Sequence, residues 1–205
     1  MPRARLAAEF ALLFVALPLV YRLGFIPLGK IPFLLLIVVG VAVVLARDPG
    51  FDRRLLWNAA PLGSELRRIV PLFLLAAAGI ALYTATAWPE RLFDMPRTET
   101  STWLLLLVLY PLLSVYPQEL VYRTFFFHRY AALLPHPAVR IGANAAVFGF
   151  MHIVYDNWIA VVATAIGGLL FAWTWERSQS TLTVSVEHAL FGCWMFTVGL
   201  GAFFS

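Results

Sequence analysis

Long apolar runs separated by short polar segments divide this sequence from end to end. The runs lack the alternation of polar and apolar positions that marks a barrel strand, so they indicate helices, which satisfy their own backbone hydrogen bonds in lipid. Several runs are shorter than the roughly 20 residues that a bilayer requires. The pattern predicts seven membrane spans, at residues 6–20, 31–46, 70–88, 103 to about 132, 138–155, 158–175 and 182–204.

Composition supports a membrane protein. Of the 205 residues, 61% are hydrophobic and only 13% are charged, which is far more apolar than a soluble domain. We therefore expect an all-α fold, a polytopic transmembrane helical bundle, in one membrane domain over residues 1–205, with accessory spans in residues 1–100. The net charge is +4, but the arginines are spread over short connections, so we expect them to face anionic lipid and not nucleic acid.

Basic residues also predict the orientation. Most of them fall in alternate connections, on one side of the predicted bundle, with the largest group between the second and third spans. By the positive-inside bias the N-terminus is cytoplasmic and the C-terminus outside, in the inner (plasma) membrane of the cell. The first run resembles a signal peptide, but it contains Glu9 and lacks a small-residue cleavage site, so we expect a retained span.

Two opposite charges lie inside the fourth apolar run. Glu119 and Arg123 are one helical turn apart with the acid first, the favourable order for an ion pair, and Pro111 and Pro117 are expected to kink the helix ahead of them. A charge at membrane depth is costly, so such a pair is a hypothesis for a functional site. The alternative is an ion pair that only holds helices together.

Two histidines lie in comparable surroundings, in the fifth and seventh runs. At about 1.5 Å per residue, Glu119, His152 and His188 fall roughly 12–18 Å from polar residues at the predicted cytoplasmic face, which places all three near the middle of the membrane. We predict that their helices bring them together. Taken singly, each histidine has the alternative role of a hydrogen bond to a neighbouring helix.

Three motifs follow one another along these runs: Gln118-Glu119-Leu-Val-Tyr-Arg123, Phe148-Gly-Phe-Met-His152, and a third that begins at His188. In order, spacing and setting they resemble the CAAX protease and bacteriocin-processing family of intramembrane endopeptidases, also called the abortive-infection family. That family has Glu-Glu-x-x-x-Arg, Phe-x-x-x-His and His-x-x-x-Asn or Asp on separate membrane helices. The resemblance covers about residues 117–201 and implies a catalytic core within residues 101–205.

The chain departs from the family pattern at two positions. Gln118 replaces the glutamate that the family uses to activate water, and a neutral amide cannot accept a proton in that role. Gly192 replaces the closing Asn or Asp, so one expected donor to the oxyanion is absent, and Asn144 or Asn157 can substitute only if the packing brings it near. The residues expected to bind substrate are Phe148, Asn144 and Cys193.

Peptide hydrolysis in a low-dielectric cavity needs a base for water and donors for the tetrahedral oxyanion. We assign Glu119 and His152 to water activation, with Gln118 beside them, Arg123 to positioning, and His188 to the oxyanion. No cofactor is expected. The alternative is a divalent metal such as zinc, held by the carboxylate and the two histidines, although the compact His-Glu-x-x-His motif is absent.

The resulting hypothesis is an intramembrane endopeptidase that cleaves a membrane-associated or lipid-modified protein with water activated by glutamate and histidine. Its partners are then that membrane protein or lipidated peptide and the lipid bilayer. The alternative, favoured by Gln118 and Gly192, is a catalytically impaired member that acts as a membrane scaffold or immunity-type protein.

Overall fold

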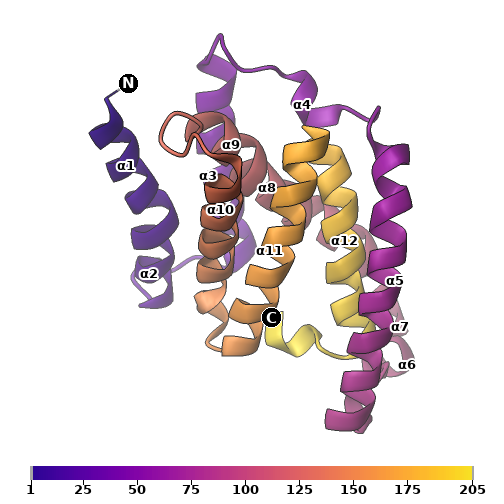
Figure 1. Ribbon diagram of the computed structural model, residues 1–205. Coiled ribbons are helices and arrows are strands. Elements are labelled where there is room, and N and C mark those ends of the chain that lie inside the picture. Colours follow the sequence, from indigo (N-terminus) through magenta and orange to yellow (C-terminus); the bar gives the residue numbers. More distant parts are fainter. Residues whose placement is uncertain (1, 205) are drawn as a thin grey trace.

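The computed structural model describes residues 2–204, and in these residues it contains helices and no strand, so the all-α prediction is confirmed. The helices run between the two ends of a single bundle (Figure 1). The long elements are α1 (Arg3–Ala11), which continues through the π-helical turn η1 (Leu12–Ala16) into α2 (Leu17–Arg22), then α3 (Lys30–Arg47), α5 (Leu62–Ala87), α10 (Pro137–Met151), α11 (Trp158–Ser178) and α12 (Thr181–Val198).

Among the described residues, six helices are long and apolar enough to cross a membrane. The fourth, at Thr100–Arg129, is 30 residues long. The seventh predicted span corresponds to α12, which is 18 residues long and less apolar because it carries Glu187 and His188. It ends earlier than predicted, at a left-handed Gly199 with φ 99°, before a short 3-10 helix, η6 (Gly201–Phe204).

The fourth span is helical throughout but alternates between two helix types. Pro111 begins a wider π-helical segment, and Pro117 lies in the short α-helical segment between two such segments; proline and π-helical turns are both sites at which helices bend. Its segments are α7 (Thr100–Tyr110), η3 (Pro111–Val115), α8 (Tyr116–Glu119), η4 (Leu120–Phe125) and α9 (Phe126–Arg129).

Glycines allow α10 and α11 to pack closely. A Cβ added to Gly149 would lie 2.7 Å from the Cβ of Ala165 and 3.0 Å from the carbonyl oxygen of Val161. On the other helix, a Cβ on Gly168 would lie 3.1 Å from the Cα of Ala145. The two backbones therefore meet with no room for a side chain, as small residues permit in membrane helices.

The connection between α3 and α5 covers one end of the bundle. It contains the short helix α4 (Arg54–Trp57). The hydroxyl of Thr181 donates to the carbonyl of Leu55 at 2.9 Å, and that of Tyr116 donates to Leu56 at 3.2 Å. Trp57 stacks on Tyr116 with ring centroids 4.6 Å apart. This connection is thus fixed to both α8 and α12.

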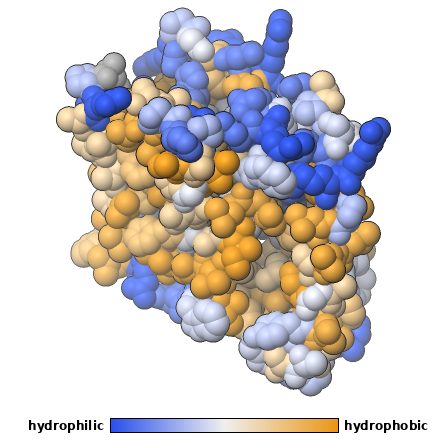
Figure 2. Space-filling view, viewed as in Figure 1, coloured by the Kyte–Doolittle hydropathy of each residue, from blue (hydrophilic) through white to orange (hydrophobic). Residues whose placement is uncertain are grey.

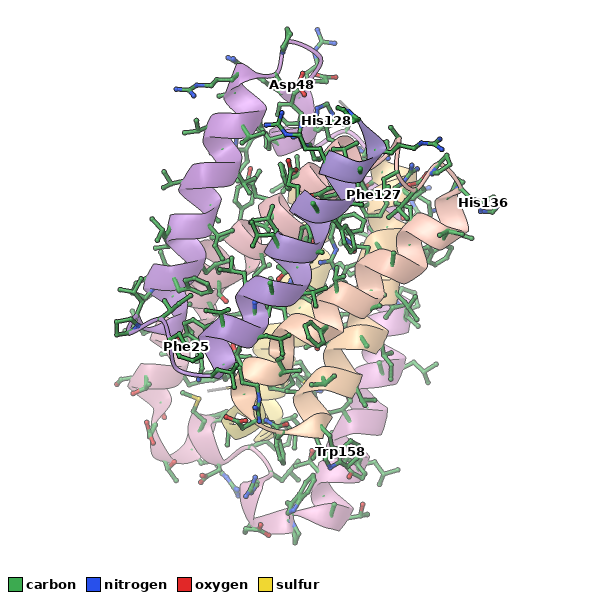
Figure 3. All side chains as sticks on the ribbon, turned by 90° about the vertical axis from the view of Figure 1, so that its left-hand side faces the viewer. Phe25, Asp48, Phe127, His128, His136 and Trp158 are labelled. Atoms are coloured by element: carbon green, nitrogen blue, oxygen red, sulfur yellow. The ribbon has the colours of Figure 1, made fainter. Side chains whose placement is uncertain are left out.

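The surface carries a broad apolar belt between more hydrophilic ends, as the space-filling view displays (Figure 2). Large side chains such as Leu75 and Phe25, each 74% exposed, belong to this lipid-compatible surface. Figure 3 places Asp48 beside His128 at one end, and His136 projects outward there. His128 Nε2 lies 2.9 Å from Asp48, and this hydrogen bond holds the pKa of the Asp48 carboxyl below its usual range.

Two glycines of α10 offer a matched test of this packing. We expect Gly149→Ala to lower the free energy of unfolding by about 1–3 kcal/mol, because the new methyl group overpacks against Ala165. Gly142 has no atom within 4 Å of an added Cβ, so Gly142→Ala is expected to be neutral or to stabilise by up to about 1 kcal/mol. Denaturant titration in detergent micelles measures both; equal effects would contradict the close helix contact.

Candidate functional site

Glu119 lies at the centre of the site. It is the last residue of α8 and is fully buried. Its Oε1 lies 2.7 Å from Nδ1 of His188 on α12, and its Oε2 lies 3.3 Å from Nε of Arg123 on η4. The predicted pair of opposite charges is thus present, and a histidine 69 residues away in the sequence joins it.

The guanidinium of Arg123 is fully buried between aromatic rings. Its central carbon lies 4.2 Å from the ring centroid of Phe148 and 5.5 Å from that of Phe171. Aromatic faces attract a cation, but within residues 2–204 no guanidinium nitrogen has a hydrogen-bond partner. Glu119 therefore supplies the compensation that a buried charge needs.

His188 is held on three sides. Its ring stacks on Phe171, with centroids 4.7 Å apart and an interplanar angle of 23°, and meets the Phe148 ring edge-on at 5.6 Å. Its Nδ1 faces Glu119, and its Nε2 lies 3.4 Å from the hydroxyl of Tyr110. Both ring nitrogens thus have defined neighbours, so the imidazole is fixed in position and orientation.

His152 approaches the same group from the end of α10. It begins the 3-10 helix η5 (His152–Tyr155), and its Nδ1 lies 2.7 Å from the carbonyl oxygen of Phe148. A carbonyl can only accept, so Nδ1 carries the hydrogen and a neutral ring has its lone pair on Nε2. The two histidine rings contact one Phe148 ring, at 4.9 Å for His152. Among the described residues, no hydrogen bond joins His152 to Glu119.

Gln118 faces away from this cluster, into an apolar cleft between α1–α3 and the fourth span. The wall of this cleft includes Met151 and Tyr155, which lie on either side of His152 in the sequence. The amide nitrogen of Gln118 donates to the hydroxyl of Ser114 at 2.7 Å, while its oxygen has no partner within residues 2–204. Of the two neighbouring residues, Gln118 thus lines the cleft and Glu119 does not.

The other candidate residues take different places. Phe148 lies between the two histidines and Arg123 and is central to the site. Asn144 is fully buried and donates from its side chain to the backbone carbonyl of Tyr122, so it ties α10 to η4. Cys193 is a partly buried free thiol on α12, next to Gly192.

A second buried polar cluster was not predicted from the sequence. Arg68 of α5 lies 3.1 Å from Glu65 and 3.4 Å from Glu187, and it also donates to the hydroxyl of Thr174. Glu187 is fully buried and precedes His188 on α12. Arg68 was counted as a loop cation, but α5 starts earlier than predicted, so it pairs inside the bundle. Glu187, an acidic residue next to His188 in an apolar run, was the feature of the sequence that could have indicated this cluster.

Glu9 joins two helices of the bundle. Its carboxylate accepts two hydrogen bonds from Arg129, at 2.8 and 2.7 Å, and one from Tyr130 at 3.1 Å. This bidentate contact joins α1 to the end of the fourth span. The N-terminal helix is therefore fixed at the wall of the apolar cleft.

The metal alternative lacks a compact ligand set in the part of the chain that the structure describes. No group of three His, Cys, Asp or Glu side chains there is close enough together to hold a metal ion. Arg123 also occupies the second oxygen of Glu119, and a cation beside that carboxylate opposes metal binding. Metal independence of the reaction stays a prediction.

Comparison with known proteins finds one family to which part of the chain is similar. Residues 100–194 match the model described as type II CAAX prenyl endopeptidase Rce1-like. This match confirms the resemblance drawn from the three motifs, and it covers the part of the chain from α7 into α12. The long apolar helices of the described residues, together with this match, indicate an integral membrane protein. No curated protein and no solved structure is similar enough to count as a match.

Replacing Arg123 tests whether the buried pair stabilises the bundle. We expect Arg123→Met to lower the free energy of unfolding by about 3–5 kcal/mol, because it leaves the Glu119 charge uncompensated. The double variant Glu119→Gln/Arg123→Met should recover most of that loss, since no charge is then left unpaired. Denaturant titration in micelles measures both variants.

The matched control is Arg22→Met. Arg22 also pairs with an acid, Asp156, but their side chains are 44% and 67% exposed, so its loss should cost about 0–1 kcal/mol. If Arg123→Met is no more harmful than Arg22→Met, the buried pair is not a stabilising element.

Proposed function

We propose that this protein is an intramembrane endopeptidase that cleaves a lipid-modified or membrane-associated protein near a terminus. The observation that carries the proposal is the group formed by Glu119, Arg123, His152 and His188 around the Phe148 ring. Its members come from three separate helices, as the family motifs require. We place the N-terminus and the basic α3–α5 connection on the cytoplasmic side of the inner (plasma) membrane.

His152 is the base that activates water in this proposal. Its Nδ1 hydrogen is engaged by the carbonyl of Phe148 at 2.7 Å, so the lone pair on Nε2 is available to a water molecule. Its neighbours Met151 and Tyr155 line the apolar cleft, which gives a route for substrate from the membrane. The amide of Gln118 projects into the same cleft and can orient that water by accepting a hydrogen bond.

Glu119 acts through His188. The sequence hypothesis paired Glu119 with His152, but the carboxylate contacts His188 at 2.7 Å and is fully buried. A carboxylate in this position accepts a hydrogen bond from Nδ1–H and so orients the imidazole. The protonated ring then offers Nε2–H to the oxyanion, and Arg123 holds the carboxylate in place.

The apolar cleft suits a substrate that carries a lipid. Its lining is mostly hydrophobic, apart from Lys30, three tyrosines, Ser114 and Gln118. Such a surface accepts an acyl or prenyl chain through burial of apolar area. The peptide bond next to the lipid would then lie near the histidines.

An impaired family member is the second candidate. The specific observation that favours it is Gln118, which faces the cleft where the family has a carboxylate that can accept a proton. In that case the fold serves as a membrane scaffold or immunity-type protein. The two candidates differ in what Gln118→Glu should do to cleavage.

Activity in proteoliposomes separates these candidates. We expect purified protein to cleave a farnesylated CAAX peptide with a fluorescent reporter. His152→Ala should lower kcat about 10²–10⁴-fold through loss of the base, and Glu119→Ala should lower it by at least about 10²-fold through loss of the oriented imidazole. Unchanged cleavage in Glu119→Ala would refute the proposal.

Two further variants complete the experiment. Glu90→Gln removes a carboxylate whose side chain is 68% exposed, in η2 (Pro89–Arg91), and should leave the rate within about twofold. Gln118→Glu should change an active enzyme little. A large gain from an inactive parent would instead establish the impaired candidate.

A further inference from the structure

Gly192 leaves a space on α12 that another helix fills. It lies one turn beyond His188, and the ring of Tyr110, the last residue of α7, packs directly on its backbone. A Cβ added at Gly192 would lie 2.7 Å from Cζ of Tyr110, and closer still to its Cε1 and its hydroxyl oxygen. Side chains do not approach so closely, so position 192 can carry none while Tyr110 is there.

The hydroxyl of Tyr110 is aimed at the site by these contacts. It lies 3.4 Å from Nε2 of His188, the nitrogen opposite Glu119. The ring packs edge-on against Phe196, with centroids 5.2 Å apart, on the same face of α12 as Gly192. Farther along, the indole N–H of Trp103 donates to the hydroxyl of Thr197 at 3.0 Å, which fixes α7 against α12.

We propose that Tyr110 supplies the second donor to the oxyanion, from a different helix and in place of the side chain that is missing at Gly192. The inference rests on the proposed function, because it assigns a role in that hydrolysis. Tyr110 O–H and His188 Nε2–H then face one point, where the carbonyl oxygen of the substrate would become negative. Two converging donors in a water-poor site are the arrangement that stabilises such a charge.

The hydrolysis balances with these groups. The water oxygen adds to the carbonyl carbon while His152 takes one water proton, and the carbonyl π electrons move to oxygen. His188 and Tyr110 donate hydrogen bonds to that oxygen and keep their protons. The intermediate then collapses: the carbon–nitrogen bond breaks, and His152 returns the proton to the leaving amine.

Tyr110→Phe is the direct test, because it removes the hydroxyl and keeps the ring on Gly192. We expect kcat for the farnesylated CAAX peptide to fall about 10²–10³-fold, the usual effect of losing one oxyanion donor, with KM within about threefold. Tyr83→Phe makes the same change on α5, at a side chain that is 53% exposed, and should leave both constants unchanged. Thermal unfolding in micelles should be the same for both variants and the wild type.

A side-chain exchange tests the geometry independently. Gly192→Asn alone should lower kcat, since the new side chain collides with Tyr110. Combined with Tyr110→Ala it should regain activity to within about tenfold of the wild type, because the amide then takes the vacated space beside His188. This rescue is not expected if Tyr110 only fills volume.

The outcomes separate the two proposals. Cleavage that depends on Glu119 but stays within twofold of wild type in Tyr110→Phe overturns the role of Tyr110 alone. Absence of cleavage in both the wild type and Gln118→Glu overturns this role together with the proposed function. A loss in Tyr110→Phe with rescue in the double variant supports both.

Discussion

The buried charge of Glu119 is the constraint on which the rest of the site depends. A carboxylate without solvent contact needs partners, and Arg123 and His188 supply them from η4 and α12. These contacts hold the fourth span against α12. They also place the Arg123 guanidinium against the rings of Phe148 and Phe171. Stability and chemistry therefore share one set of contacts, and changes that remove one partner are expected to affect both.

Other residues of α12 are also in contact with neighbouring spans. Glu187, next to His188, is buried and is compensated by Arg68 of α5, while Gly192 receives the ring of Tyr110 from α7. Glu187, His188 and Gly192 of this helix are thus each in contact with a residue of another span. α12 is fixed from three directions, which suits a helix that must hold one imidazole precisely oriented.

The helical fold and the group around Glu119 could be predicted from the sequence. Apolar runs in a membrane form helices, and isolated charges within them need partners from other helices. The pairing of Glu119 with His188 and not with His152 could not be predicted, since it depends on how the π-helical turns rotate the fourth span. The position of Tyr110 beside His188 could not be predicted either, because a tyrosine in an apolar run usually indicates a packing residue. Arg68 was misassigned because the start of α5 lies in a polar segment without an apolar pattern.

The π-helical turns of the fourth span also make it sensitive to length. A π-helical turn holds one residue more than an α-helical turn, and each residue of an α-helix advances the rotation by about 100°. Deleting a single residue within η4 (Leu120–Phe125) would let the turn relax to α and swing the following rings, which bind α1, away from their partners. The number of residues in η4 therefore matters to the geometry of the site as much as the identity of Arg123 within it.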